Sequence, residues 1–143
     1  MLKGINKIIS PELLKTLCEM GHGDEIVIAD GNFPADTFGK RVIRADGISG
    51  VEMLKAVLLL IPLDTYSDPN MILMRLMACD EGKINPVIWG EYEKIARAED
   101  KNVKIGNIDR FEFYERAKNA YAVIATGEEA VYANIILKKG VIK

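Results

Sequence analysis

The chain contains one histidine and two cysteines among its 143 residues. A single histidine without a histidine–carboxylate ligand cluster argues against a catalytic zinc site, so we expect neither a metal nor a cofactor. The cysteines, Cys18 and Cys79, lie in apolar runs and show no C-x-x-C spacing. This arrangement favours buried free thiols in a reducing compartment over a disulfide or a metal site.

The sequence also has no excess of positive charge and no long apolar segment. Its formal net charge is -2, which gives no indication of a surface for nucleic acid. The longest apolar run, residues 56–63, is too short to cross a bilayer, and no apolar core of signal-peptide length follows the start. We therefore expect a cytoplasmic protein with neither a nucleic-acid nor a membrane partner. No repeat or linker divides the chain, so residues 1–143 are expected to form a single domain.

Two common catalytic motifs are missing as well. There is no phosphate-binding G-x-x-x-x-G-K-[ST] loop, which argues against a nucleotide-driven kinase. There is no G-x-S-x-G nucleophile elbow of the kind found in serine hydrolases. The chemistry that remains accessible is proton transfer without a cofactor or a covalent intermediate.

Signals for helices alternate with signals for strands along the chain. Ser10 and Pro11 begin a helix that Gly21 can end, and Ser49 with Glu52 forms a capping box before the next helix. Further helices are expected over residues 85–98 and 111–120. Strands are expected at residues 25–29, 41–44, 71–79, 103–105, 121–126 and 134–137.

This alternation predicts an α/β fold with a largely parallel sheet of about six strands, covered on both faces. The last two strands are close in sequence, which suggests one antiparallel member and hence a mixed sheet. Ligands of such folds bind beyond the carboxyl ends of the strands. Asp30 and the loop with Asn32 and Phe33 would lie there.

His22 and Asp30 are the first candidates for chemistry. An imidazole titrates near neutrality and can both donate and accept a proton, and the glycines beside His22 would leave its ring accessible. The alternative is a histidine that only interacts with the dipole at a helix end. Asp30 could orient that imidazole or accept hydrogen bonds from substrate hydroxyls, or it could simply form an Asx turn.

A second group of candidates lies in the last quarter of the chain. Arg110 could hold a hydroxyl or a carboxylate with its planar donors, or it could be a solvated arginine near a helix start. Tyr132, Ala133 and Asn134 offer a phenol, a backbone amide and a carboxamide together, which suits a polyol. Alternatively, these three residues could only form a turn beside an edge strand.

Six dispersed motifs resemble those of the ribose-pyranase and fucose-mutarotase family and follow the family's order over nearly the whole length. They are I-S-P-E-L-L-K at residues 9–15, E-M-G-H-G-D-E-I at 19–26, N-F-P-A at 32–35, V-I-R-A-D-G at 42–47, R-F-E-F-Y-E-R-A at 110–117 and N-I-I-L-K-K-G-V at 134–141. The resemblance implies a three-layer α/β/α fold over a mixed sheet. It also implies an isomerase that interconverts the α and β anomers of L-fucose, an activity of fucose metabolism.

The resemblance assigns roles to the candidate residues. His22 corresponds to the acid/base, and Asp30, Arg110, Tyr132, Ala133 and Asn134 correspond to the residues that bind the sugar. It further implies self-association into a ring-like homo-oligomer, a homodecamer in bacterial members, with sites near subunit contacts.

Two other functions stay open at this stage. Ala133 replaces a glycine that is frequent in fucose mutarotases and matches the Tyr-Ala-Asn of ribose pyranases, which exchange pyranose and furanose forms. The motif that begins at Arg110 favours the fucose branch. The other alternative is a sugar-binding module that keeps the pocket without the catalysis.

Overall fold

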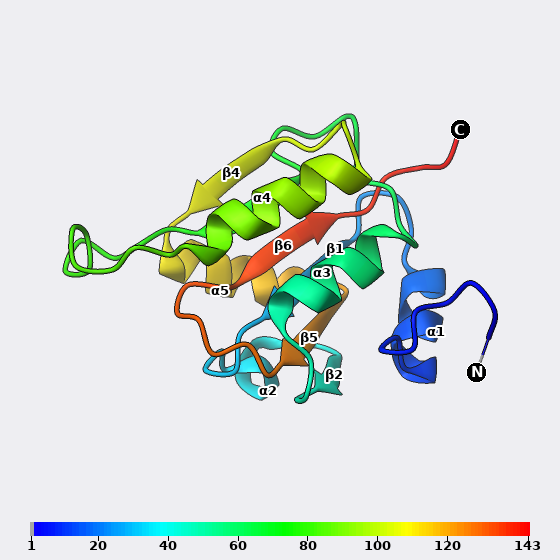
Figure 1. Cartoon of the computed structure of the whole chain (residues 1–143), viewed down its shortest axis with the longest axis horizontal. Coiled ribbons are helices and arrows are strands. Elements are labelled where there is room, and N and C mark those ends of the chain that lie inside the picture. The colour runs from blue at the N-terminus through cyan, green and yellow to red at the C-terminus, as the bar shows by residue number, and fades with distance from the viewer. Residues whose placement is uncertain (1) are drawn as a thin grey trace.

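The computed structural model of the protein describes residues 2–143. Its six strands form one mixed sheet in the order β2-β5-β1-β6-β3-β4 (Figure 1). The strands are β1 Glu25–Ala29, β2 Val42–Ala45, β3 Met71–Met74, β4 Ile105–Ile108, β5 Ala122–Thr126 and β6 Ile135–Lys138. The helices are α1 Pro11–Glu19, α2 Ala35–Phe38, α3 Gly50–Leu58, α4 Ile88–Glu99 and α5 Arg110–Asn119.

Side-chain caps fix the starts of three of these helices. The Ser10 side chain accepts a hydrogen bond from the Leu13 amide at α1, and Ser49 with Glu52 forms a complete capping box at α3. Asp109 accepts from two amides at the start of α5. These contacts satisfy backbone donors that a helix leaves unpaired in its first turn, so the polar sequence signals determine the boundaries.

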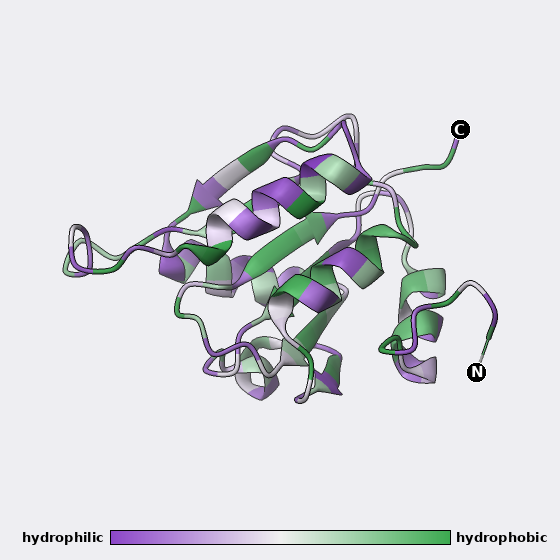
Figure 2. Ribbon diagram, viewed as in Figure 1, coloured by the Kyte–Doolittle hydropathy of each residue, from purple (hydrophilic) through white to green (hydrophobic). Residues whose placement is uncertain are grey.

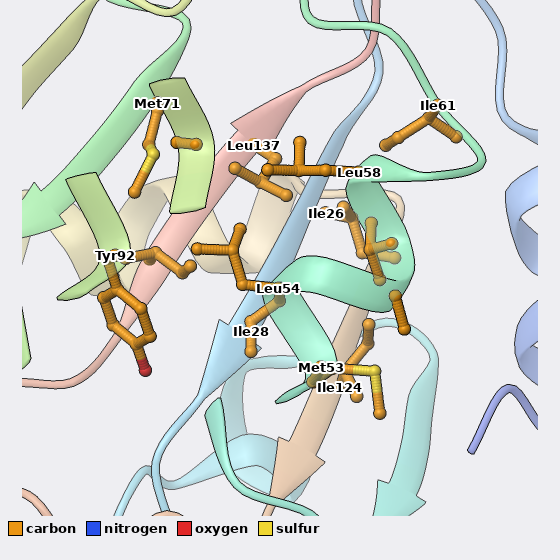
Figure 3. Packing of buried hydrophobic residues seen from close by; sticks show 14 of the residues in the cluster. Ile26, Ile28, Met53, Leu54, Leu58, Ile61, Met71, Tyr92, Ile124 and Leu137 are labelled. Atoms are coloured by element: carbon orange, nitrogen blue, oxygen red, sulfur yellow. The ribbon is translucent and has the colours of Figure 1, made fainter. Parts of the chain in front are cut away.

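Alternating apolar side chains on the strands feed two cores, one on each face of the sheet. Ile26 and Ile28 of β1 belong to the cluster covered by α1, α3 and α4 (Figure 3). Val27 and Ala29, which point the other way, pack against Phe113 beneath α2 and α5. Helices on both faces make the three-layer α/β/α architecture that the sequence resemblance implied. Figure 2 shows the apolar central strands and the mixed polarity of α4. One face of this helix packs on the sheet, and the opposite face is exposed to solvent.

Five strands run in one direction and β6 runs against them. β1 pairs in parallel with β5 and antiparallel with β6, and β6 pairs antiparallel with β3. The prediction of one antiparallel strand is therefore confirmed, although β6 lies next to β1 and β3 rather than next to β5. As a consequence, the start of β6 meets the carboxyl ends of β1 and β3 at one edge of the sheet.

Several detailed predictions were wrong. The apolar run at 71–79 forms a strand only as far as Met74, because Arg75 and the following residues leave the sheet in a loop that projects from it (Figure 1). Cys18 and Cys79 are free, as expected, but exposed rather than buried. The short helix α2 was not predicted. Among residues 2–143, no helix combines the length and the apolar character that crossing a membrane requires.

Candidate active site

A small cavity of about 280 Å³ opens at the edge of the sheet where the parallel strands end. Four of the predicted site residues line it: Asp30, Arg110, Tyr132 and Asn134. Its remaining lining residues are Asn32, Phe33, Met74, Tyr114 and Val131. The cavity thus combines several hydrogen-bonding groups with aromatic and aliphatic walls, the composition expected of a site for a small polar ligand.

Asp30 and Asn134 hold each other in place across the β1–β6 pair. The Asp30 amide donates to Asn134 Oδ1 at 2.8 Å, and Asn134 Nδ2 donates back to Asp30 Oδ2 at 2.8 Å. Asp30 Oδ1 accepts from the Asn32 amide at 3.0 Å. Burial raises the pKa of the Asp30 carboxyl above its ordinary value, while these hydrogen bonds oppose the rise. A ligand hydroxyl that donated to this carboxylate would stabilise it further.

Helix α4 supports the backbone of the 132–134 segment. Trp89 Nε1 donates to the Tyr132 carbonyl at 2.8 Å, and the Tyr92 hydroxyl donates to the Ala133 carbonyl at 3.0 Å. Tyr132 has a φ of 60°, a left-handed conformation that is costly for a side chain of its size. The contacts from α4 hold this strained turn and so direct the phenol towards the cavity. Ala133 itself is buried behind the cavity and does not line it.

Replacing Tyr92 with phenylalanine is expected to destabilise the protein by about 1–3 kcal/mol, because the buried Ala133 carbonyl loses its donor. Tyr92 is fully buried, so water cannot replace the lost hydroxyl without rearrangement. Tyr121→Phe is the matched control, since its hydroxyl makes only an exposed contact with Glu19 at 3.4 Å. Chemical denaturation of both variants measures the difference, and equal midpoints would contradict the role given to Tyr92.

Arg110 reaches the cavity from the first turn of α5. Its Nε donates to the Tyr114 hydroxyl at 2.8 Å, and its guanidinium lies 5.3 Å from the centre of that ring. The phenol of Tyr132 meets the loop after β3: it accepts from the Met77 amide at 3.2 Å and donates to Asp80. The end of β1, the start of α5 and the segment before β6 therefore each bring a group that can bind hydroxyls to the cavity.

His22 lies at the opposite edge of the sheet, in the turn before β1. β1 has five residues and spans roughly 17 Å at the usual rise of a strand, so His22 and Asp30 of the same chain are far apart. The expectation that Asp30 could orient the imidazole is therefore wrong within one chain. Instead, His22 Nε2 lies 3.1 Å from Oδ1 of Asp64, in the segment that follows α3.

Apolar side chains line the space next to His22. A hollow of about 520 Å³ beside it is lined largely by aliphatic side chains, among them Leu17, Met20, Ile61 and Ile142. The ammonium group of Lys139, which also lines it, already donates to the carbonyls of Leu17 and Met20. This hollow offers a polyol few hydrogen-bond partners and is better suited to contact with another protein surface.

The structure therefore brings Asp30, Arg110, Tyr132 and Asn134 together and leaves His22 apart from them. Sequence reasoning did not find Asp64, Tyr66 and Ser67 around the imidazole, because the turn D-T-Y-S-D-P carries no signal for a partner 42 residues away. It also missed Met74 and Val131 in the cavity wall, which read as ordinary core or loop residues. In the described part of the chain, no group of three or more histidine, cysteine, aspartate or glutamate side chains could hold a metal ion.

Comparison with known proteins gives consistent matches over the whole chain. Residues 3–142 match the RbsD / FucU transport protein family. The human protein named fucose mutarotase is 50% identical over 145 residues, which cover 99% of this chain and 94% of that protein. The crystal structure of the fucose mutarotase from Streptococcus pneumoniae in complex with L-fucose is 49% identical, with a TM-score of 0.93 over 99% of this chain and 100% of that one. Bacillus subtilis RbsD complexed with D-ribose is more distant, at 26% identity and a TM-score of 0.72, with both chains covered in full.

Proposed function

The chain belongs to the RbsD / FucU transport protein family, and from this premise we propose that it is an isomerase that interconverts the α and β anomers of L-fucose. One observation carries the proposal. The cavity residues Asp30, Arg110, Tyr132 and Asn134 converge from the end of β1, the start of α5 and the start of β6. The chain has 49% sequence identity to a fucose mutarotase of the same fold that was crystallised with L-fucose. The ribose-bound relative is only 26% identical, which makes ribose the weaker candidate.

The reaction requires two coupled proton transfers. The anomeric hydroxyl of the pyranose loses its proton, the bond between C1 and the ring oxygen breaks, and the ring oxygen gains a proton. Rotation about the C1–C2 bond then presents the other face of the aldehyde, and ring closure reverses the proton transfers. The imidazole of His22 is suited to this chemistry, because an imidazole can both accept and donate a proton.

The cavity residues would bind the sugar while the proton moves. The Asp30 carboxylate accepts hydrogen bonds from sugar hydroxyls, and Asn134 fixes its orientation. Arg110 donates to hydroxyl oxygens, and the phenol of Tyr132 contacts the sugar beside it. Ala133 contributes its backbone, which Tyr92 holds at the carbonyl. Binding of several hydroxyls at once favours fucose over sugars that lack one of them.

The acid/base and the sugar pocket must come from two copies of the chain. Within one chain they lie at opposite edges of the sheet, and no side-chain movement closes a gap of the length of β1. The apolar hollow beside His22 supports this arrangement, because it offers a surface on which a second copy can dock with its sugar pocket facing the imidazole. The exposed ring of Tyr66, 5.7 Å from that of His22, lies at the same place.

Self-association into a ring-like homo-oligomer, a homodecamer as in bacterial members of the family, would repeat this contact around the assembly. A closed ring of identical head-to-tail contacts places one complete site at each junction. We place the protein in the cytoplasm, where exposed thiols such as Cys18 and Cys79 remain reduced.

Saturation-transfer NMR on equilibrated L-fucose tests the proposed activity. When the anomeric proton of the α form is saturated, the β signal is expected to lose intensity only if the protein is present. D-ribose serves as the parallel substrate. Transfer among ribose forms without transfer in fucose would identify a pyranase, and binding of fucose without transfer would identify a non-catalytic sugar-binding module.

A further inference from the structure

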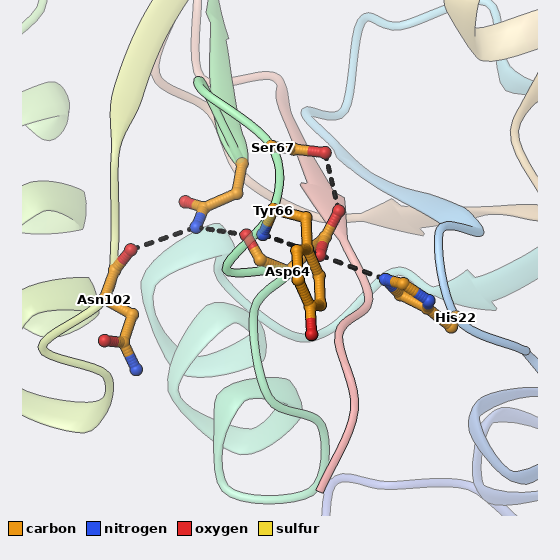
Figure 4. A network of polar contacts seen from close by, with 6 residues as sticks. His22, Asp64, Tyr66, Ser67 and Asn102 are labelled. Carbon is orange, nitrogen blue, oxygen red and sulfur yellow. Dashed lines mark hydrogen bonds and ion pairs between the residues drawn. The ribbon is translucent and has the colours of Figure 1, made fainter. Parts of the chain in front are cut away.

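His22 is held by a buried carboxylate that is not among the residues singled out by the sequence. Its Nε2 lies 3.1 Å from Oδ1 of Asp64 (Figure 4). The Asp64 side chain is only 4% exposed, whereas that of His22 is 45% exposed. The ring is therefore anchored on its inner side and open on its outer side, which is the arrangement needed for a side chain that reacts with a bound molecule.

Asp64 is itself fixed from several directions. Its Oδ2 accepts from the Ser67 hydroxyl at 2.6 Å, and its Oδ1 also accepts from the Tyr66 amide at 3.0 Å. The backbone of Asp64 is tied to the sheet, since its amide donates to the Lys138 carbonyl at 2.9 Å. Its own carbonyl accepts from Asn70 Nδ2 at 2.9 Å. These partners fix the orientation of the carboxylate. Its hydrogen bond with Nε2 in turn fixes the orientation of the imidazole.

The chemistry of the pair decides which nitrogen of His22 carries the proton. Hydrogen bonds, first of all that from Ser67, lower the pKa of Asp64 to about 2, so the carboxylate is ionised at neutral pH and can only accept. Nε2 must therefore be the protonated nitrogen of the neutral ring. Nδ1 is then the free base, and it is turned away from Asp64 (Figure 4).

We propose that Asp64 is a positioning residue of the reaction, which holds His22 as the Nε2–H tautomer with Nδ1 directed at the sugar. This inference rests on the proposed function. Nδ1 takes the proton of the anomeric hydroxyl as the C1–O1 double bond forms and the bond from C1 to the ring oxygen breaks. Nδ1–H then gives that proton to the ring oxygen. Asp64 keeps no proton and stabilises the imidazolium that exists between the two transfers.

Histidine labelled with ¹⁵N tests the tautomer directly. His22 is the only histidine in the chain, so one pair of imidazole nitrogen signals reports on it without assignment. In the neutral ring of the wild type we expect a protonated Nε2 and an unprotonated Nδ1. In Asp64→Ala we expect a mixture of both tautomers, and kcat for anomer exchange about 10–100-fold lower with little change in KM.

Two milder variants keep the test informative if Asp64→Ala does not fold. Asp64→Asn keeps the shape and an oxygen that can accept from Nε2, so the tautomer should persist while kcat falls because the imidazolium loses its counter-charge. Ser67→Ala removes one hydrogen bond to Asp64 and should lower kcat less than either change at Asp64. Asp46→Asn changes an exposed aspartate that follows the outer strand β2, pairs with Arg44 and does not line the cavity. It is the matched control and should leave tautomer and turnover unchanged.

The result separates this inference from the proposed function, because the tautomer is read without any turnover. A wild-type protein that exchanges anomers but carries its proton on Nδ1 would overturn the role of Asp64. The same holds if Asp64→Ala and Asp64→Asn both keep wild-type kcat. A protein that exchanges no anomers would overturn the proposed function, whichever tautomer is found.

Discussion

Replacement of His22 with alanine is expected to lower protein-catalysed exchange of fucose anomers by about 10²–10⁴-fold, the usual contribution of a positioned general acid and base. His22 is the only histidine of the chain, so no second imidazole of the same copy can take over its role. The measurement is the exchange rate between the α and β anomeric signals at saturating fucose.

Binding of fucose should survive this replacement, because the groups that we propose hold the sugar are at the other edge of the sheet. The folded state should survive as well, since the ring is nearly half exposed and Asp64 keeps its bonds from Ser67 and Tyr66. Binding is read by saturation-difference NMR, and folding by thermal denaturation. Wild-type exchange in His22→Ala would show that another group moves the proton.

Exchanging the acid and the amide between positions 30 and 134 should separate stability from turnover. In Asp30→Asn alone, the new amide cannot accept from both Asn32 and Asn134, so one donor faces another in every orientation. In Asn134→Asp alone, two carboxylates face each other. We expect each single change to lower the free energy of unfolding by about 1–3 kcal/mol and to lower turnover by at least tenfold.

The double variant, Asp30→Asn with Asn134→Asp, restores a complete set of hydrogen bonds. The new aspartate accepts from the amide of residue 30 and from its new carboxamide, which in turn accepts from the Asn32 amide. Stability should return close to that of the wild type. Turnover should stay low, because the negative charge has moved away from position 30, which we propose receives the sugar hydroxyls. Full recovery of turnover would show that the charge is not needed at Asp30.

Much of the fold could be predicted because local signals and packing agree. Ser10 and the Ser49–Glu52 capping box mark helix starts that the structure confirms. The alternation of residues 26–29 supplies both cores. By contrast, the run at 71–79 looks the same whether it is a strand or a loop, and only the tertiary structure ends the strand, where the Arg75 amide makes its last sheet contact with Ile108.

The candidate site shows a different limit of sequence reasoning. Asp30 could be placed beyond the carboxyl end of its strand, and the family motifs mark Arg110, Tyr132 and Asn134. The structure brings all four to one cavity. His22 and Asp30 are close in sequence, but His22 precedes β1 and Asp30 follows it. The length of the strand therefore separates them, and they lie at opposite edges of the sheet. The contact between His22 and Asp64 depends on the path of the chain after α3, for which no local pattern exists.

Mixed oligomers test most directly the claim that each site joins His22 of one copy to the sugar pocket of another. Chains with His22→Ala are co-expressed with chains that carry the exchanged pair at 30 and 134, and each pure variant is assayed beside the mixture. If the site is shared, random assembly at equal amounts leaves about a quarter of the sites with both parts intact, and about that fraction of wild-type exchange should appear. A mixture no more active than the two pure variants would contradict the shared site.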